Sequence, residues 1–158
     1  MAEKKLIEVY NLRKYFPIKL GFFKSLFTSE VPLVRAVDNI SFTIDEGEVF
    51  GLVGESGCGK TTTGRLLLRL IEPTAGKIFF KGIDLLKLSR AEMRKLRRKM
   101  QIIFQDPYES LNPRMSIYDI ISEPLHLLKL VETEDEARER VYEVMEAMDL
   151  VPPEEYML

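Results

Sequence analysis

Two hydrophobic patterns in the first third of the chain predict two kinds of β-strand. Residues 36–44 alternate between apolar and polar side chains, and this period of two predicts an antiparallel strand with one face exposed to water. Residues 49–53 are continuously apolar, as in a strand that is buried on both faces. Shorter apolar runs at 6–10, 77–80 and 101–104 predict three further strands.

Helices are predicted where apolar residues recur with helical spacing, and the first is expected over 61–70. Three further helix starts are predicted by residue pairs that have the spacing of a capping box: Ser89 with Glu92, Ser116 with Asp119, and Thr133 with Glu136. These helices are expected to run to about Lys99, towards Leu130, and up to Pro152. Pro124 is expected to interrupt or restart the second of them.

Irregular structure is predicted at 11–35, which contains prolines and glycine, and at 105–115, which contains Pro107 and Pro113. The resulting order is antiparallel strands, a buried strand, a glycine-rich loop, a helix, a strand, a helix, a strand and then helices. This order predicts an α/β fold, with a layered core over 1–115. Residues 116–158 are expected to form the beginning of a mostly helical subdomain.

Composition narrows the class of protein. The chain has 158 residues, a net charge of −2, 46% apolar and 30% charged residues, which suits one globular domain and excludes a disordered chain. No uncharged apolar run approaches the roughly 18 residues of a membrane-spanning helix, and the N-terminal residues have no apolar signal-peptide core. The single cysteine, Cys58, excludes an internal disulfide framework, so we expect a cytosolic location.

Charge is distributed unevenly. Residues 87–99 hold seven basic and one acidic side chain, and residues 132–146 hold seven acidic side chains and two arginines. Each segment is expected to be a solvated helix face. Because no aromatic residue is interleaved with the basic charges, nucleic-acid binding is the weakest candidate function.

The segment GLVGESGCGKTT, at 51–62, carries the strongest functional signal. Gly54, Gly59, Lys60 and Thr61 match the phosphate-loop pattern G-x-x-x-x-G-K-[ST]. The pattern requires a strand before the loop and a helix after it, and both are predicted here. An accidental glycine turn would have to match all four positions and both flanks, so the segment predicts a site for a nucleoside triphosphate and Mg²⁺.

Each residue type in this loop has a chemical reason. The glycines at 54, 57 and 59 allow left-handed backbone and close approach to an anion, and the helix N-terminus adds partial positive charge. Lys60 is expected to bridge the β- and γ-phosphates, Thr61 to ligate Mg²⁺, and Thr62 to reach the α-phosphate. Cys58 is expected to be a small filler that bound nucleotide shields. The other nucleotide-binding candidates in the loop are Gly54, Glu55, Ser56, Gly57 and Gly59.

Longer stretches resemble the nucleotide-binding subunits of ABC transporters, and among them the oligopeptide and dipeptide (peptide/nickel) importer branch. These stretches are AVDNISF at 36–42, GEVFGLVGESGCGKTT at 47–62, LLRLIEPTAGKIFFKGIDL at 67–85 and LRRKMQIIFQDPYESLNPRMSIYDIISEPL at 96–125. QDPYESLNPR is the most branch-specific piece, and the resemblance runs from about Leu6 to the last residue. It implies a P-loop NTPase core of the ABC type, with an antiparallel β-subdomain and the start of a helical subdomain.

The resemblance also implies site residues and partners. Gln105 matches the family's hinge-loop glutamine, which would ligate Mg²⁺ or the attacking water. Phe16 is expected to stack on the adenine of ATP, with Tyr15 as the alternative. Residues 105–115 would contact a transmembrane permease subunit, and a second ATPase subunit would pair with this one around two ATP molecules. Such a protein works on the inner face of the cell membrane and couples ATP binding and hydrolysis to peptide uptake.

Three later family motifs do not occur in these 158 residues: the serine–glycine signature, an apolar strand that ends in Asp-Glu, and a switch histidine. Asp45 and Glu46 precede the phosphate loop, and His126 precedes the place of the signature, so they do not replace these motifs. We therefore expect an incomplete cassette that binds nucleotide weakly at best and does not hydrolyse it alone. The alternative is a non-catalytic nucleotide-binding or regulatory module, or a decayed or truncated product.

Overall fold

The computed structural model describes residues 4–18, 32–105 and 111–153. The chain divides into two compact units, Met1–Gln101 and Ile102–Leu158, and each is described by itself. The division into 1–115 and 116–158 drawn from the sequence stays a prediction.

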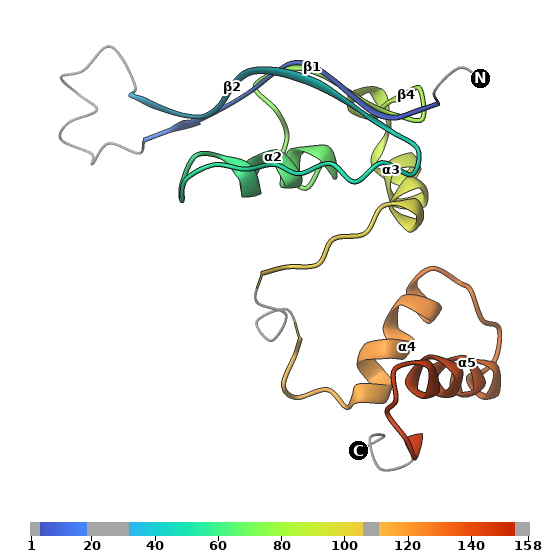
Figure 1. Ribbon diagram of the computed structural model, residues 1–158. Coiled ribbons are helices and arrows are strands. Elements are labelled where there is room, and N and C mark those ends of the chain that lie inside the picture. Colours follow the sequence, from blue (N-terminus) through green and yellow to red (C-terminus); the bar gives the residue numbers. More distant parts are fainter. Residues whose placement is uncertain (1–3, 19–31, 106–110, 154–158) are drawn as a thin grey trace, which may run out of the picture. The chain divides into compact units, whose positions relative to one another are not determined.

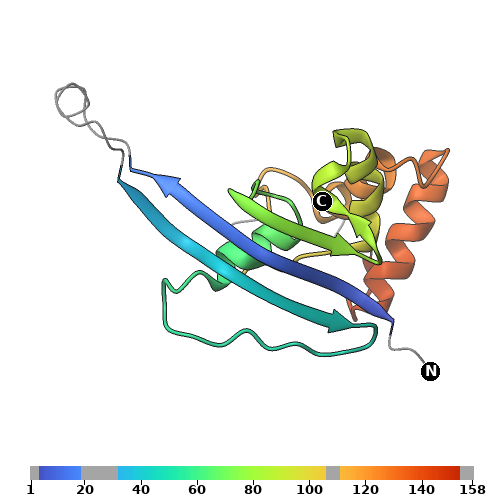
Figure 2. The ribbon, with the colours of Figure 1, turned by 90° about the horizontal axis from the view of Figure 1, so that it is seen from above.

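A four-stranded antiparallel sheet forms the centre of the first unit, in the order β2-β1-β3-β4. Its strands are β1 (Lys5–Pro17), β2 (Leu33–Asp45), β3 (Ala75–Phe80) and β4 (Ile83–Asp84). β1 and β2 form a long hairpin that extends beyond the end of β3 (Figures 1 and 2). The antiparallel strand expected from the alternating pattern at 36–44 is thereby confirmed.

The hairpin is longer than the sequence predicted. The loop expected over 11–35 is wrong at both ends, because β1 continues to Pro17 and β2 begins at Leu33. One further main-chain hydrogen bond extends the pair, from the Ile18 N–H to the Pro32 oxygen at 2.9 Å. Paired main-chain groups hold this part as a ribbon despite its prolines. The rest of the expected loop lies outside the described residues.

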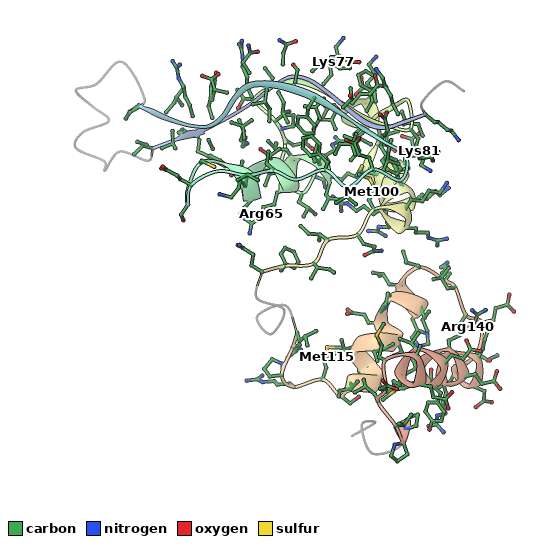
Figure 3. All side chains as sticks on the ribbon, viewed as in Figure 1. Arg65, Lys77, Lys81, Met100, Met115 and Arg140 are labelled. Carbon is green, nitrogen blue, oxygen red and sulfur yellow. The ribbon has the colours of Figure 1, made fainter. Side chains whose placement is uncertain are left out.

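One face of the sheet is covered by α2 (Lys60–Leu67), the short 3₁₀ turn η1 (Leu85–Lys87) and α3 (Arg90–Leu96), which η2 (Arg97–Lys99) extends. The core lies between them and is formed by buried side chains from both layers: Val9, Leu12, Val37, Leu66, Ile78, Phe80, Leu85 and Met93. Figure 3 shows Arg65 of α2 pointing away from the sheet, and Lys77 of β3 on the opposite sheet face. The period-two pattern therefore separates a core face from a water-exposed face.

The ends of α2 and α3 follow local chemistry. The Ser89–Glu92 capping box is present, and α3 with η2 reaches Lys99 as predicted. α2 ends at Leu67 rather than at residue 70, because Arg69 adopts a left-handed conformation with φ of 49°. The Arg69 guanidinium then donates to the main-chain oxygens of Leu85 and Leu88, at 2.7 and 2.6 Å.

Two apolar runs that were predicted as strands are not strands in this structure. Residues 49–53 pair with none of the strands that the structure describes, and Val49 and Val53 are 97% and 94% exposed. Residues 101–104 are likewise irregular, and Ile103 is 92% exposed. Both predictions are wrong for the same reason: main-chain bonds to neighbouring strands hold a central strand in place, and no described strand pairs with either run.

The second unit contains α4 (Ile117–Leu127) and α5 (Glu134–Ala147). α5 contributes three buried apolar side chains, Ala137, Val141 and Met145. α4 passes through Pro124 without interruption, so the interruption expected there is wrong. The proline has no N–H to donate to the preceding turn, but its own carbonyl oxygen still accepts from the Leu128 N–H, at 3.0 Å.

The two predicted caps of this unit differ in detail. Ser116 and Asp119 form the full reciprocal capping box at the start of α4. At α5, the Thr133 hydroxyl accepts from the Glu136 N–H as predicted. The Glu136 carboxylate, however, accepts from the N–H of Glu132 at 2.9 Å, one residue earlier than in a capping box. Across the described parts of both units, no helix is long and apolar enough to span a membrane.

Candidate phosphate-binding site

The glycines of the loop before α2 differ in what they provide. Gly57 and Gly59 have φ values of 82° and 100°, in the left-handed region that residues with a Cβ rarely adopt. Gly54 is not in this region, but a Cβ there would lie 2.6 Å from the Cys58 Sγ atom. Gly54 therefore allows the loop to close on Cys58, and the other two allow it to turn.

Gly59 also brings the end of the loop against the sheet. The register of β1 and β2 steps over Ala36, between the paired residues Arg35 and Val37, so Ala36 forms a β-bulge in β2. A Cβ on Gly59 would lie 2.1 Å from the main-chain oxygen of Ala36 and 3.7 Å from a Val37 methyl carbon. Val37 is a core residue, so the loop ends on the core face of the sheet, at the bulge.

Lys60 connects the two sides of the loop. Its Nζ atom donates to the main-chain oxygens of Gly54 and Glu55, each at 2.6 Å, and lies 3.6 Å from the Cys58 Sγ atom. The ammonium group is thus held among the loop atoms by main-chain dipoles and not by a carboxylate. Its positive charge is not neutralised by any ion pair found among the described residues.

The N-terminus of α2 has the features of an anion site. Its N-cap residue, Gly59, makes no side-chain cap, and the first turn contains no acidic residue. The first N–H groups of a helix lack partners within the helix and carry partial positive charge. Together with the Lys60 ammonium and the left-handed turns, they form a surface suited to a phosphate chain.

Sequence reasoning missed Thr63. Its side chain is 4% exposed, and its N–H and hydroxyl both donate to the Gly59 oxygen, at 2.8 and 3.0 Å. Thr63 therefore holds the carbonyl group of Gly59, one of the two left-handed glycines of the loop. In the run Thr61-Thr62-Thr63 the sequence gives no sign of which threonine faces inward. Thr61 is exposed and Thr62 is half-buried.

The two candidate aromatic residues lie on opposite faces of the hairpin. Phe16 shares the face of Lys14 and Val37, the same face as the phosphate loop, and is 39% exposed. Tyr15 lies on the other face, where its hydroxyl donates to the Asp38 carboxylate. This hydrogen bond raises the pKa of Tyr15 and keeps the phenol neutral.

The loop residues 54–62 and the aromatic pair belong to the first unit, whereas Gln105 belongs to the second. Gln105 is an exposed residue of the second unit. Residues 106–110 of the expected permease contact lie outside the described residues. In the described parts of the chain there is no group of three or more His, Cys, Asp or Glu that could hold a metal ion.

Comparison with known proteins gives the family of the chain. Residues 37–157, well over half of the sequence, match the ABC transporter family. The chain belongs to the ABC transporter family. Among curated relatives, it is similar to the oligopeptide transport ATP-binding proteins AppF and OppF of Bacillus subtilis, with 44% identity over 151 residues and 46% over 148 residues.

These alignments cover 95% and 93% of this chain but only 44% and 45% of the relatives. The chain thus spans less than half the length of these relatives.

Solved structures show the same fold class. The chain is similar to the ATP-binding cassette MJ0796, in a dimeric post-hydrolysis state bound to ADP and Pi, with a TM-score of 0.69 and 26% identity over 89% of this chain and 56% of that one. For cbiO1 from Clostridium perfringens, part of the ABC transporter complex cbiONQ, the TM-score is 0.63 at 26% identity, over 91% of this chain and 50% of that one. The fold is therefore that of an ABC ATPase cassette, of which this chain covers about half. The fold class expected from the sequence is confirmed.

Proposed function

We propose that this chain is the ATP-binding part of an ABC importer ATPase that couples ATP binding and hydrolysis to the uptake of oligopeptides or dipeptides. The phosphate loop carries this proposal. It combines the Lys60 ammonium, two left-handed glycines and an uncapped helix N-terminus without an acidic residue. Relatives named as oligopeptide transport ATP-binding proteins supply the substrate class.

In this proposal the triphosphate lies along the loop. Lys60 is the one cation held inside the loop, so it serves the β- and γ-phosphates, while main-chain N–H groups from Glu55 to Thr62 donate to phosphate oxygens. Binding requires the Lys60 Nζ to exchange its bonds to the Gly54 and Glu55 oxygens for phosphate oxygens. A charged acceptor is stronger than a carbonyl oxygen, which favours this exchange.

Mg²⁺ fits this site only together with the nucleotide. The described residues contain no group of three or more His, Cys, Asp or Glu that could hold a metal ion, and Mg²⁺ commonly takes few protein ligands beside phosphate oxygens and water. The exposed Thr61 hydroxyl, in the first turn of α2, is the ligand that the loop offers, and Gln105 is proposed as a second. When bound, the ion supplies positive charge that stabilises the phosphate oxygens during phosphoryl transfer.

We assign the adenine to Phe16 and not to Tyr15. Phe16 lies on the face of the sheet that also meets Gly59, whereas Tyr15 is on the opposite face and bonded to Asp38. Trimming each residue to alanine and measuring ATP affinity tests this assignment. Loss of affinity in Phe16→Ala but not in Tyr15→Ala supports it, and the reverse result contradicts it.

The whole assembly is also proposed from these relationships. A second ATPase subunit pairs with this one, and transmembrane permease subunits bind through residues 105–115 on the inner face of the cell membrane. One neighbour of known structure is dimeric. That the 158 residues alone do not hydrolyse ATP stays a prediction, tested by steady-state phosphate release and its dependence on Lys60.

Peptide uptake by cells tests the proposed function as a whole. We expect that cells whose gene carries Lys60→Ala lose uptake of labelled tripeptides, while uptake of a labelled free amino acid is unchanged. Lys77→Ala, on the open face of the sheet, is the matched control and should retain peptide uptake (Figure 3). Unchanged peptide uptake in Lys60→Ala cells contradicts the proposal.

A further inference from the structure

The two neighbouring aromatic residues of β1 are each covered by a cation. The Lys14 Nζ atom lies 4.8 Å from the centroid of the Phe16 ring, and the Arg35 guanidinium carbon lies 5.6 Å from the centroid of the Tyr15 ring. Both distances are within the range of a cation–π interaction. The two pairs lie on opposite faces of the same hairpin.

Lys14 is anchored more firmly than an ordinary surface lysine. Its ammonium donates to the Glu72 main-chain oxygen at 2.7 Å, and Glu72 lies in the segment that connects α2 to β3. A main-chain hydrogen bond also ties this segment to β1, because the Thr74 N–H donates to the Arg13 oxygen at 2.8 Å. The cation is therefore tied to a fixed point of the backbone and not to a mobile carboxylate.

This anchoring has a consequence for Phe16. The Phe16 ring is 39% exposed and lies opposite Val34, which is 51% exposed, so few contacts hold it in one orientation. The anchored cation covers one side of the ring and thereby restricts its rotation, while exposed ring surface remains for a second aromatic partner.

We propose that Lys14 is a positioning residue, which holds the Phe16 ring ready to stack on a purine base. This inference rests on the proposed function and adds a residue that the phosphate-loop pattern does not contain. Lys14 acts on the base and not on the phosphates, so its effect is confined to ligands that carry a base. Arg35 makes the same cation–π interaction with Tyr15, but Tyr15 lies on the face opposite the phosphate loop, so Arg35 does not affect ATP binding.

Calorimetric titration of the purified protein with ATP and with inorganic triphosphate tests this proposal. We expect Lys14→Met, which keeps the apolar stem, to weaken ATP binding about two- to fivefold, the size of an exposed cation–π contribution. Triphosphate binding should be unchanged, which also reports that the variant is folded. Lys14→Arg should restore ATP affinity, and Arg35→Met should not alter it.

The double variant shows whether Lys14 acts through Phe16. In the Phe16→Ala background, Lys14→Met should cause no further loss of ATP affinity. An equal loss in both backgrounds, or unchanged ATP affinity in Lys14→Met, overturns the role of Lys14 while leaving the phosphate site intact. If the unaltered protein binds neither ATP nor triphosphate, the proposed function and this inference are both overturned.

Discussion

Gly59 of the phosphate loop lies so close to the main-chain oxygen of Ala36 that a Cβ at position 59 would be 2.1 Å from it. Ala36 is the bulged residue of β2, and its neighbours Arg35 and Val37 are both paired with β1, so the sheet holds the main chain on either side of it. The loop is thus positioned by one contact between glycine and backbone, and neither partner has a flexible side chain that can move away.

We predict that Gly59→Ala destabilises the fold more than an ordinary left-handed glycine does. At Gly47, where φ is 83° and nothing would lie within 4 Å of a Cβ, alanine should cost only the left-handed strain of about 1–2 kcal/mol. At Gly59 the clash with Ala36 adds to this strain. Urea unfolding of both variants measures the difference, and equal losses of unfolding free energy would contradict the contact.

The thiol of Cys58 offers a direct probe of loop occupancy. Cys58 is exposed, and its Sγ atom lies beside Gly54 and the Lys60 ammonium. We predict that Mg-ATP slows alkylation of Cys58 severalfold, because bound phosphate covers the loop. The rate is measured by mass spectrometry, with AMP as the control nucleotide. Equal labelling rates with and without Mg-ATP would exclude phosphate from the loop.

The hydrogen bond between Tyr118 and Glu134 makes the second, helical unit (Ile102–Leu158) less stable at alkaline pH. The Tyr118 hydroxyl donates to the Glu134 carboxylate, and this bond raises the pKa of Tyr118 to about 12 from its ordinary value of 10. A raised pKa means that the stabilisation is complete below about pH 10 and is lost as the pH rises towards 12.

The comparison with Tyr118→Phe isolates this effect from other groups that titrate at high pH. We predict that the unaltered protein is more stable than Tyr118→Phe below pH 10, and that the difference disappears as the pH approaches 12. Chemical unfolding at a series of pH values measures it. A difference that stays constant across this range would show that the bond does not contribute.

The capping box of α4 predicts a local stability change. The Ser116 hydroxyl accepts from the Asp119 N–H at 3.1 Å, and the Asp119 carboxylate accepts from the Ser116 N–H at 3.3 Å. We expect Ser116→Ala to lower the unfolding free energy of the helical unit by about 1 kcal/mol, and Ser116→Asn to lower it much less. If the two variants unfold alike, the side-chain cap is not what stabilises this end of α4.

Local signals in the sequence predicted local structure well. Ser89 with Glu92, and Ser116 with Asp119, mark helix starts because both partners of the capping box lie within four residues. The alternating run at 36–44 predicted β2 for a similar reason, since one covered face is enough to set a period of two.

Features that depend on tertiary packing could not be predicted from the sequence. Residues 49–53 have the composition of a buried strand, but a strand forms only beside partners, and the described residues supply none. Instead, Phe50 stacks on Phe42 with ring centroids 5.1 Å apart. The bulge at Ala36 depends on the pairing of β1 with β2, and the cation over Phe16 is anchored on the distant Glu72 oxygen, so spacing along the sequence encodes neither. The Thr63 hydroxyl bonds locally, to the Gly59 oxygen, but three consecutive threonines do not show which of them faces inward.

Calorimetric titration of the folded protein with Mg-ATP tests the assignment of the phosphate loop most directly. We predict saturable binding of one nucleotide per chain, lost or weakened at least about tenfold in Lys60→Ala, which removes a charge-assisted contact to phosphate. The Lys77→Ala control should bind like the unaltered protein. Absence of ATP binding in folded protein, or equal affinity in Lys60→Ala, would contradict the assignment of residues 54–62 as a nucleotide site.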